Sequence, residues 1–247
     1  MVGRAAALLT PRFVAGLALL GALLAYYAFF RKLPNLPTTA DVLFVAFGLI
    51  PAVFGLVLLA LPLRESPALL VAGGVCALLA VVASLVDLDV VANFAKLGAA
   101  TAIGFWFLGL FERLSWVVLV AMIIPVVDAV SVWRGPTNKI VTDQPEVFGA
   151  LSFAFPVADE GSFQLGIPDL LFFAVFLAAA DRWGLRVGLT WLALAASFGI
   201  TMALAVWVDP FGLGGLPALP LLSVAFLAAN ADLLWRELRS HPDRVSG

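Results

Sequence analysis

The stretch LSWVVLVAMIIPVVDAVSVW, residues 114–133, is long and apolar enough to cross a lipid bilayer as a helix. One carboxylate, Asp128, interrupts this run. A second aspartate, Asp169, lies in the next apolar run, LGIPDLLFFAVFLAAA, residues 165–180. An ionisable side chain inside hydrocarbon is costly and usually marks a functional site. The two aspartates are therefore the first candidates for such a site.

The composition places the whole chain among membrane proteins. Of its 247 residues, 63% are hydrophobic and 12% are charged, whereas soluble domains contain about 45–50% apolar residues. The formal net charge of -2 offers no basic surface, so we expect no nucleic-acid partner. We expect one membrane domain over residues 1–247, with N-terminal helices in 1–112 and the aspartate-bearing helices in 113–247.

Hydrophobic runs of about 20 residues, the length that spans a bilayer, recur along the chain. Short polar breaks separate most of them, so sequential helices should be antiparallel neighbours. The first run lacks a small-residue cleavage site and is expected to remain as an anchor. The sequence predicts an all-α polytopic membrane protein with about eight transmembrane helices, at 13–30, 41–63, 67–87, 91–111, 114–133, 165–183, 186–208 and 214–235.

The connection from Arg134 to Gln164 is the longest and most polar one. It contains apolar residues that predict a short strand ending at Pro156, namely Val147, Leu151, Phe153 and Phe155. This segment is too short to span the bilayer as a helix. Two interpretations remain open: an exposed strand edge that pairs with an extended peptide, or a loop hairpin on the membrane surface.

The distribution of Arg and Lys predicts the orientation, because cytoplasmic loops are enriched in these residues. With eight spans, the side opposite the termini carries Arg31, Lys32, Lys96, Arg134 and Lys139. The side that holds both termini carries more cations: Arg4, Arg12, Arg64, Arg113, Arg182, Arg186, Arg236, Arg239 and Arg244. We therefore expect a multi-pass protein of the cell membrane with both termini in the cytoplasm.

The two aspartates are predicted to lie at similar depth. Asp128 precedes Arg134 by six positions, which is roughly 9 Å of helix. Asp169 follows the polar segment 161–164 by five to eight positions, which corresponds to roughly 8–12 Å. Both enter from the same membrane face, so two carboxyl groups on adjacent antiparallel helices can face each other.

Two facing carboxyl groups hold a single proton over a wide pH range, because two negative charges repel strongly in such a medium. This state suits peptide hydrolysis by an aspartic mechanism, in which one group activates water and the other protonates the carbonyl. The alternative is structural, with an aspartate that caps a broken helix or pairs with a cation. Lys96 is the intramembrane cation candidate, and it lies near a span end where it could reach water.

Three segments resemble the GxGD intramembrane aspartyl proteases, the family of presenilin, signal peptide peptidase and their microbial homologues. They are DAVSVWRGP (128–136), LGIPDLLFF (165–173) and LPALPLL (216–222). The resemblance implies that Asp128 and Asp169 are the catalytic pair and that Gly166 belongs to the second motif. It also implies that Pro217, Ala218 and Leu219 shape the active site and help to place the substrate, and that substrates add in extended form to the strand near Phe153.

The chain departs from the family pattern in two ways. Pro168 replaces the second glycine of the motif, so that it reads GIPD, and proline fixes φ and removes a backbone donor. Such a proline is tolerated in a first helical turn, but it lowers activity if the family needs backbone freedom there. The family typically has nine spans, whereas eight are counted here.

We expect no metal or cofactor, because the one histidine, His241, and the one cysteine, Cys76, form no ligand pattern. The leading hypothesis is an intramembrane aspartyl endopeptidase, whose partners would be the lipid bilayer and transmembrane peptides or proteins. A first alternative is a catalytically inactive homologue that binds transmembrane segments, which Pro168 favours. A second is a proton-coupled transporter or channel that uses the same carboxylates as a relay.

Overall fold

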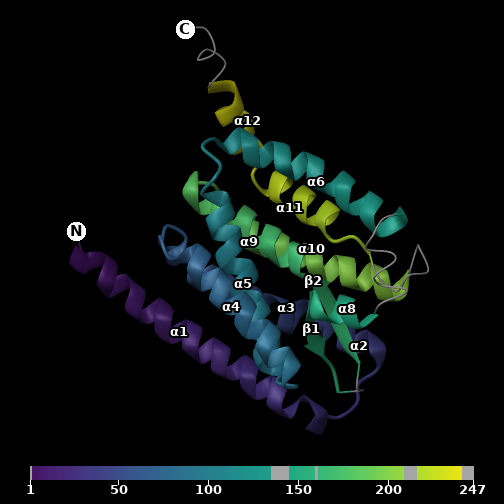
Figure 1. The fold of residues 1–247 in the computed structure, drawn as a ribbon. Helices are drawn as coiled ribbons and strands as arrows, with labels where there is room; N and C mark the ends of the chain where they lie inside the picture. The colour runs from purple at the N-terminus through teal and green to yellow at the C-terminus, as the bar shows by residue number, and fades with distance from the viewer. Residues whose placement is uncertain (1, 135–144, 159–160, 209–215, 241–247) are drawn as a thin grey trace.

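A computed structural model describes residues 2–134, 145–158, 161–208 and 216–240 (Figure 1). The regular secondary structure of the described chain is helical except for one hairpin of two strands, β1 (Ser152–Pro156) and β2 (Ser162–Gly166). Short 3-10 turns occupy Phe30–Lys32 and Leu61–Leu63, and a π-helical turn occupies Val45–Leu49. The α-helices are α1 (Val2–Phe29), α2 (Thr38–Phe44), α3 (Ile50–Ala60), α4 (Leu69–Leu85), α5 (Asp89–Leu108), α6 (Leu114–Arg134), α8 (Pro145–Ala150), α9 (Ile167–Arg182), α10 (Val187–Trp207), α11 (Leu219–Ala229) and α12 (Ala231–Ser240).

The class is that of an all-α polytopic membrane protein. By length and composition, five helical segments of the described chain can cross a membrane, or six if α11 and α12 form one span despite a 71° bend between them. By these criteria, the described chain has fewer membrane-spanning helices than the eight predicted. The helix α4 has 17 residues, and α9 has 16 because it begins at Ile167, after residues that belong to β2.

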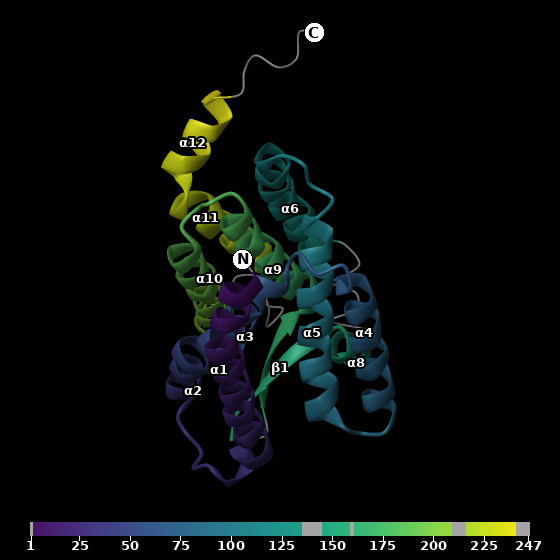
Figure 2. The same ribbon diagram turned by 90° about the vertical axis from the view of Figure 1, so that its left-hand side faces the viewer.

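The helices pack in a continuous series (Figure 1). The antiparallel pair of α4 and α5 is followed by α9, on which α5 lies, and α9 in turn contacts α10. The helix α11 lies between α10 and α6, while α1 runs along α3 at the edge. Figure 2 shows α12 extending from the bundle at the end opposite the hairpin.

Stacked phenylalanine rings join the central helices. The Phe54 ring of α3 lies 3.8 Å from Phe173 of α9 and 5.0 Å from Phe198 of α10, measured between centroids. The Phe176 ring of α9 lies 4.8 Å from Phe226 of α11. Because lipid removes most of the hydrophobic driving force between helices, such direct packing contacts hold the bundle together.

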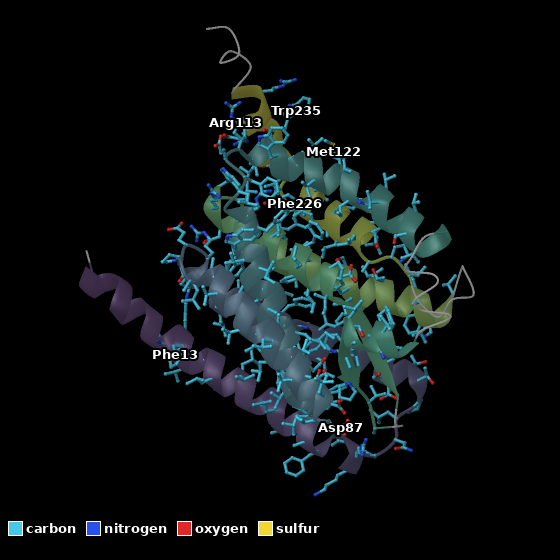
Figure 3. The ribbon with its side chains drawn as sticks, in the orientation of Figure 1. Phe13, Asp87, Arg113, Met122, Phe226 and Trp235 are labelled. Atoms are coloured by element: carbon cyan, nitrogen blue, oxygen red, sulfur yellow. The ribbon has the colours of Figure 1, made fainter. Side chains whose placement is uncertain are left out.

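Ion pairs join helix ends at the end of the bundle opposite the hairpin. Arg64 pairs with Asp181, and both terminal nitrogens of Arg186 donate to the Asp232 carboxylate at 2.7 Å. Figure 3 shows Arg113 and Trp235 at this end of the bundle. These contacts join connections that the charge pattern predicts on one membrane side.

The bend between α11 and α12 is built around Asn230, whose side chain is fully buried. Its Nδ2 donates to Thr190 Oγ1 at 2.8 Å and to the Phe226 carbonyl at 3.0 Å. Its Oδ1 accepts from the Arg186 N–H at 3.0 Å. The last predicted span is therefore broken by a buried amide that replaces backbone hydrogen bonds of the helix.

The hairpin lies at the other end of the bundle and leads directly into α9. The strands are antiparallel, with Ser152 opposite Gly166 and Phe155 opposite Phe163. The predicted strand was expected to include Val147, but this residue lies in α8. A helical turn therefore precedes the strand, and the extended segment begins at Ser152.

We predict that Gly104→Ala destabilises the bundle. A Cβ at Gly104 would lie 2.8 Å from the Leu171 carbonyl oxygen and 3.0 Å from Ala174 Cβ, so α5 and α9 would have to separate. The expected loss in free energy of unfolding is about 1–3 kcal/mol, measured by thermal or denaturant unfolding in detergent. Gly74→Ala in α4 is the control, because its Cβ meets nothing within 4 Å. Equal stability of the two variants would contradict this account of the α5–α9 contact.

Candidate functional site

The helices α6 and α9 carry the two aspartates in different ways. Asp128 lies within α6, whereas Asp169 is the third residue of α9. The preceding residues 162–166 are extended, so the helical rise assumed from residue 161 in predicting the depth of Asp169 was wrong. The hairpin, and not a helical turn, brings Asp169 to its position.

The start of α9 provides a donor for Asp169. The backbone N–H of Gly166, the N-cap residue, donates a hydrogen bond to the Asp169 carboxyl group. An acidic side chain at the third helical position commonly reaches back to the N-cap N–H in this way. The positive end of the helix dipole also favours a carboxylate in the first turn.

The start of α11 provides the corresponding donor for Asp128. The backbone N–H of Leu219, the first residue of α11, donates to Asp128 Oδ2 at 3.2 Å. The first N–H groups of a helix have no partner within the helix, and this one is satisfied by the carboxylate. The side chains of Ala218 and Leu219 are buried, and Pro217 is half-buried.

The two carboxyl groups are close enough to interact electrostatically, and both side chains are half-buried. Gly166 leaves room for the Asp169 carboxyl group, because a Cβ at this position would lie 3.1 Å from Asp169 Oδ2. Asp128, Asp169, Gly166 and Leu219 are thus brought together from three segments that are distant in sequence. The arrangement joins two acids, each with one backbone donor, at the end of a hairpin.

Pro168 occupies the second position of α9 and is exposed. A residue in the first helical turn has no intrahelical acceptor for its N–H, so proline removes no helical hydrogen bond there. The helix continues without a break to Arg182. The GIPD sequence is therefore compatible with the helix start that positions Asp169.

Phe153 is a predicted substrate-binding residue, but its side chain faces the protein interior. It is fully buried, and its ring packs against Phe155, Phe94 and Tyr27 at centroid distances of 4.9, 5.9 and 6.4 Å. Its contribution in this conformation is to fix the hairpin on α1 and α5. Contact between a peptide and this ring would require the hairpin to move.

Lys96 was expected to reach water or to pair with an acid. Its Nζ instead donates to the carbonyl oxygens of Gly149 at 2.9 Å and Ser152 at 3.1 Å. The Lys96 side chain therefore links α5 to the junction between α8 and β1. This contact assigns Lys96 to the hairpin and not to the carboxyl pair.

Three residues that sequence reasoning did not select also contact the hairpin backbone. They are Tyr26 and Tyr27 of α1 and Asn93 of α5. An amide and two hydroxyls within apolar spans are the available signal, since polar side chains in lipid need partners. Their partners could not be named from sequence, because the bonds cross 61 to 130 residues.

Neither the family comparison, the search of curated proteins nor the search of solved structures finds a match for this chain. Within the described ranges, no group of three or more His, Cys, Asp or Glu side chains could hold a metal ion. His241 lies outside the described residues. The carboxyl pair and the three motif segments are therefore the features of this chain that point to a function.

We predict that Asp128→Asn and Asp169→Asn leave the protein as stable as the wild type or more stable. Each amide keeps an oxygen that accepts from the Leu219 or Gly166 N–H, and it replaces an acid whose ionised form is costly to bury. We expect the melting temperature in detergent at neutral pH to be unchanged or to rise by about 2–4 °C, which is about 1 kcal/mol for a chain of this size.

The control is Asp232→Asn, which weakens the two-point contact with Arg186 and should lower the melting temperature. A fall of several degrees in either site variant would instead identify that aspartate as a structural capping group.

Proposed function

We propose that the chain is an intramembrane aspartyl endopeptidase that cleaves transmembrane helices or leftover signal peptides with Asp128 and Asp169. The observation that carries this proposal is that the two carboxyl groups interact electrostatically, while the Leu219 N–H donates to Asp128. The three segments that resemble the GxGD proteases thus supply neighbouring groups. Independent motifs that arose by chance would have no reason to converge.

Hydrolysis follows from a proton shared by the pair. The ionised carboxyl group takes a proton from a water molecule, whose oxygen attacks the carbonyl carbon of the scissile bond. The protonated carboxyl group donates its proton to the carbonyl oxygen, which gives a tetrahedral intermediate. When the C–N bond breaks, the nitrogen leaves as an amine after it receives a proton from the pair. Backbone donors from Gly166 and Leu219 hold the two acids in place throughout.

The substrate is expected to bind in extended form at the outer edge of β2. A helical peptide bond is shielded, because its carbonyl oxygen is hydrogen-bonded within the helix, so the substrate must unwind before attack. The strand β2 ends at Gly166, three residues before Asp169. A peptide paired with this edge would therefore be guided to the carboxyl pair.

We further propose that all eight apolar segments cross the membrane and that both termini are cytoplasmic. The helix α4, with 17 residues, is about 26 Å long, close to the thickness of the hydrocarbon layer. The ion pairs Arg64–Asp181 and Arg186–Asp232 support this count, because they join the second, sixth, seventh and eighth segments at one end of the bundle. An eight-pass chain requires these ends to share one side.

The test is cleavage of a reporter transmembrane substrate by purified protein in liposomes. We predict that Asp128→Asn and Asp169→Asn each lower the cleavage rate by about 10²–10⁴-fold, because each removes one acid–base group. Asp87→Asn is the control. It lies in the exposed connection between α4 and α5 with φ 57°, a conformation that asparagine also adopts.

Equal cleavage by the wild type and both site variants would remove the protease proposal. Binding of the reporter without cleavage by any form would support an inactive homologue, and Pro168→Gly would then test whether the proline is responsible. Proton flux through the liposomes that depends on both aspartates, without cleavage, would instead support a transporter.

A further inference from the structure

The outer edge of β1 is occupied by side chains from two membrane helices. In the hairpin, the Ile167 N–H donates to the Leu151 carbonyl and the Val157 N–H donates to the Gly161 carbonyl. Because inward and outward backbone groups alternate in an antiparallel pair, the register directs the backbone groups of Ser152, Ala154 and Pro156 away from β2. Such an exposed edge would normally accept another strand.

Asn93 binds this edge as a strand residue would. Its Oδ1 accepts from the Ala154 N–H at 2.8 Å, and its Nδ2 donates to the Ala154 carbonyl at 2.9 Å. Both outward backbone groups of Ala154 are therefore paired with one carboxamide, which has the same donor and acceptor as a peptide bond. The Asn93 side chain is 6% exposed, so water does not compete for these bonds.

Neighbouring side chains also donate to the outward carbonyls of β1. The Tyr27 hydroxyl donates to the Ala154 carbonyl at 2.6 Å and accepts from Asn93 Nδ2 at 3.3 Å. The Tyr26 hydroxyl donates to the Pro156 carbonyl at 2.7 Å, and Lys96 Nζ donates to the Ser152 carbonyl. Pro156 itself has no N–H to offer.

The outer edge of β2 differs. The same register directs the backbone groups of Ser162, Gln164 and Gly166 outward. Among the residues that the structure describes, the outward backbone groups of this edge form one hydrogen bond, from the Gly166 N–H to Asp169. The residues Ser162 and Gln164 are also exposed. The outer edge of β1 is thus covered by helix side chains, whereas the outer edge of β2 is exposed.

We propose that Asn93, supported by Tyr26, Tyr27 and Lys96, is a positioning residue that takes the place of a third strand on β1. It closes that edge and fixes the hairpin to α1 and α5. An extended peptide can then bind only at the outer edge of β2, in one register relative to Asp169. This inference rests on the proposed protease function. It assigns the N-terminal helices a role in substrate placement.

The mechanism predicts different effects on long and short substrates. A transmembrane substrate that reaches β2 depends on where the hairpin is held. A short peptide that covers little more than the scissile bond depends on the two carboxyl groups and the Leu219 N–H. A change at Asn93 should therefore impair the long substrate selectively, whereas general damage to the fold would impair both.

The test uses Asn93→Leu, which keeps a side chain branched at Cγ and removes both hydrogen-bonding atoms. For the long substrate we expect kcat/KM to fall by about tenfold or more, with additional cleavage sites two residues from the original one, because side chains keep their faces only when register shifts by two. For the short peptide, kcat/KM and the Kd of a short hydroxyl-isostere inhibitor should stay unchanged. Thr101→Val, also buried on α5, is the control and should alter none of these.

A parallel loss for the long and short substrates, or no loss for either, would overturn the positioning role. Hydrogen–deuterium exchange provides a readout that does not need cleavage. Asn93→Leu should speed exchange of the Ala154 amide without changing amides in the centre of α9. Unchanged exchange at Ala154 would refute the closed edge, whether or not the protein cleaves peptides. If Asn93→Leu speeds exchange of the Ala154 amide as expected but the wild type cleaves no substrate, the protease proposal is refuted. The role of Asn93 in substrate placement is then refuted with it.

Discussion

Two carboxyl groups held together in a medium that disfavours their charges are the constraint on which the rest of the structure depends. Asp128 and Asp169 interact electrostatically, and they would repel each other if both were ionised. Each receives one backbone N–H, from Leu219 for Asp128 and from Gly166 for Asp169. Backbone donors are well suited to this task, because they cannot rotate away as a side chain can.

Both donors exist because helices begin at the site. A continuous helix has no free N–H groups in its interior, whereas the first turn of a helix has several. The helix α9 begins at Ile167 after a strand, and α11 begins at Leu219 after a proline-containing segment. Such interrupted segments are tolerated at membrane depth where they are buried in protein or line a polar cavity. The two helix starts and the hairpin therefore act together to position the two carboxyl groups.

Much of this arrangement could be predicted from sequence, because charges in apolar runs are conspicuous. Asp128 and Asp169 were identified in this way, and the 217–219 segment was identified by the motif resemblance. The strand before Asp169 was not predicted, since LGIPDLLFF has the composition of a continuous span and Pro168 alone signals a first turn. In the described chain, the helices long enough to span by length and composition are fewer than eight, because β2 shortens α9 and a 71° bend at Asn230 divides the last segment. The role of Asn93 depends on the register of a hairpin 61 residues away, which no local pattern encodes.

The most direct test of the central claim is the protonation state of the pair, measured by infrared spectroscopy of the protein in lipid at neutral pH. We predict one protonated carboxyl band that is present in the wild type and absent from both Asp128→Asn and Asp169→Asn, because removal of either acid leaves the other free to ionise. A wild-type spectrum without such a band, or a band that persists in both variants, would contradict the sharing of one proton by these two side chains.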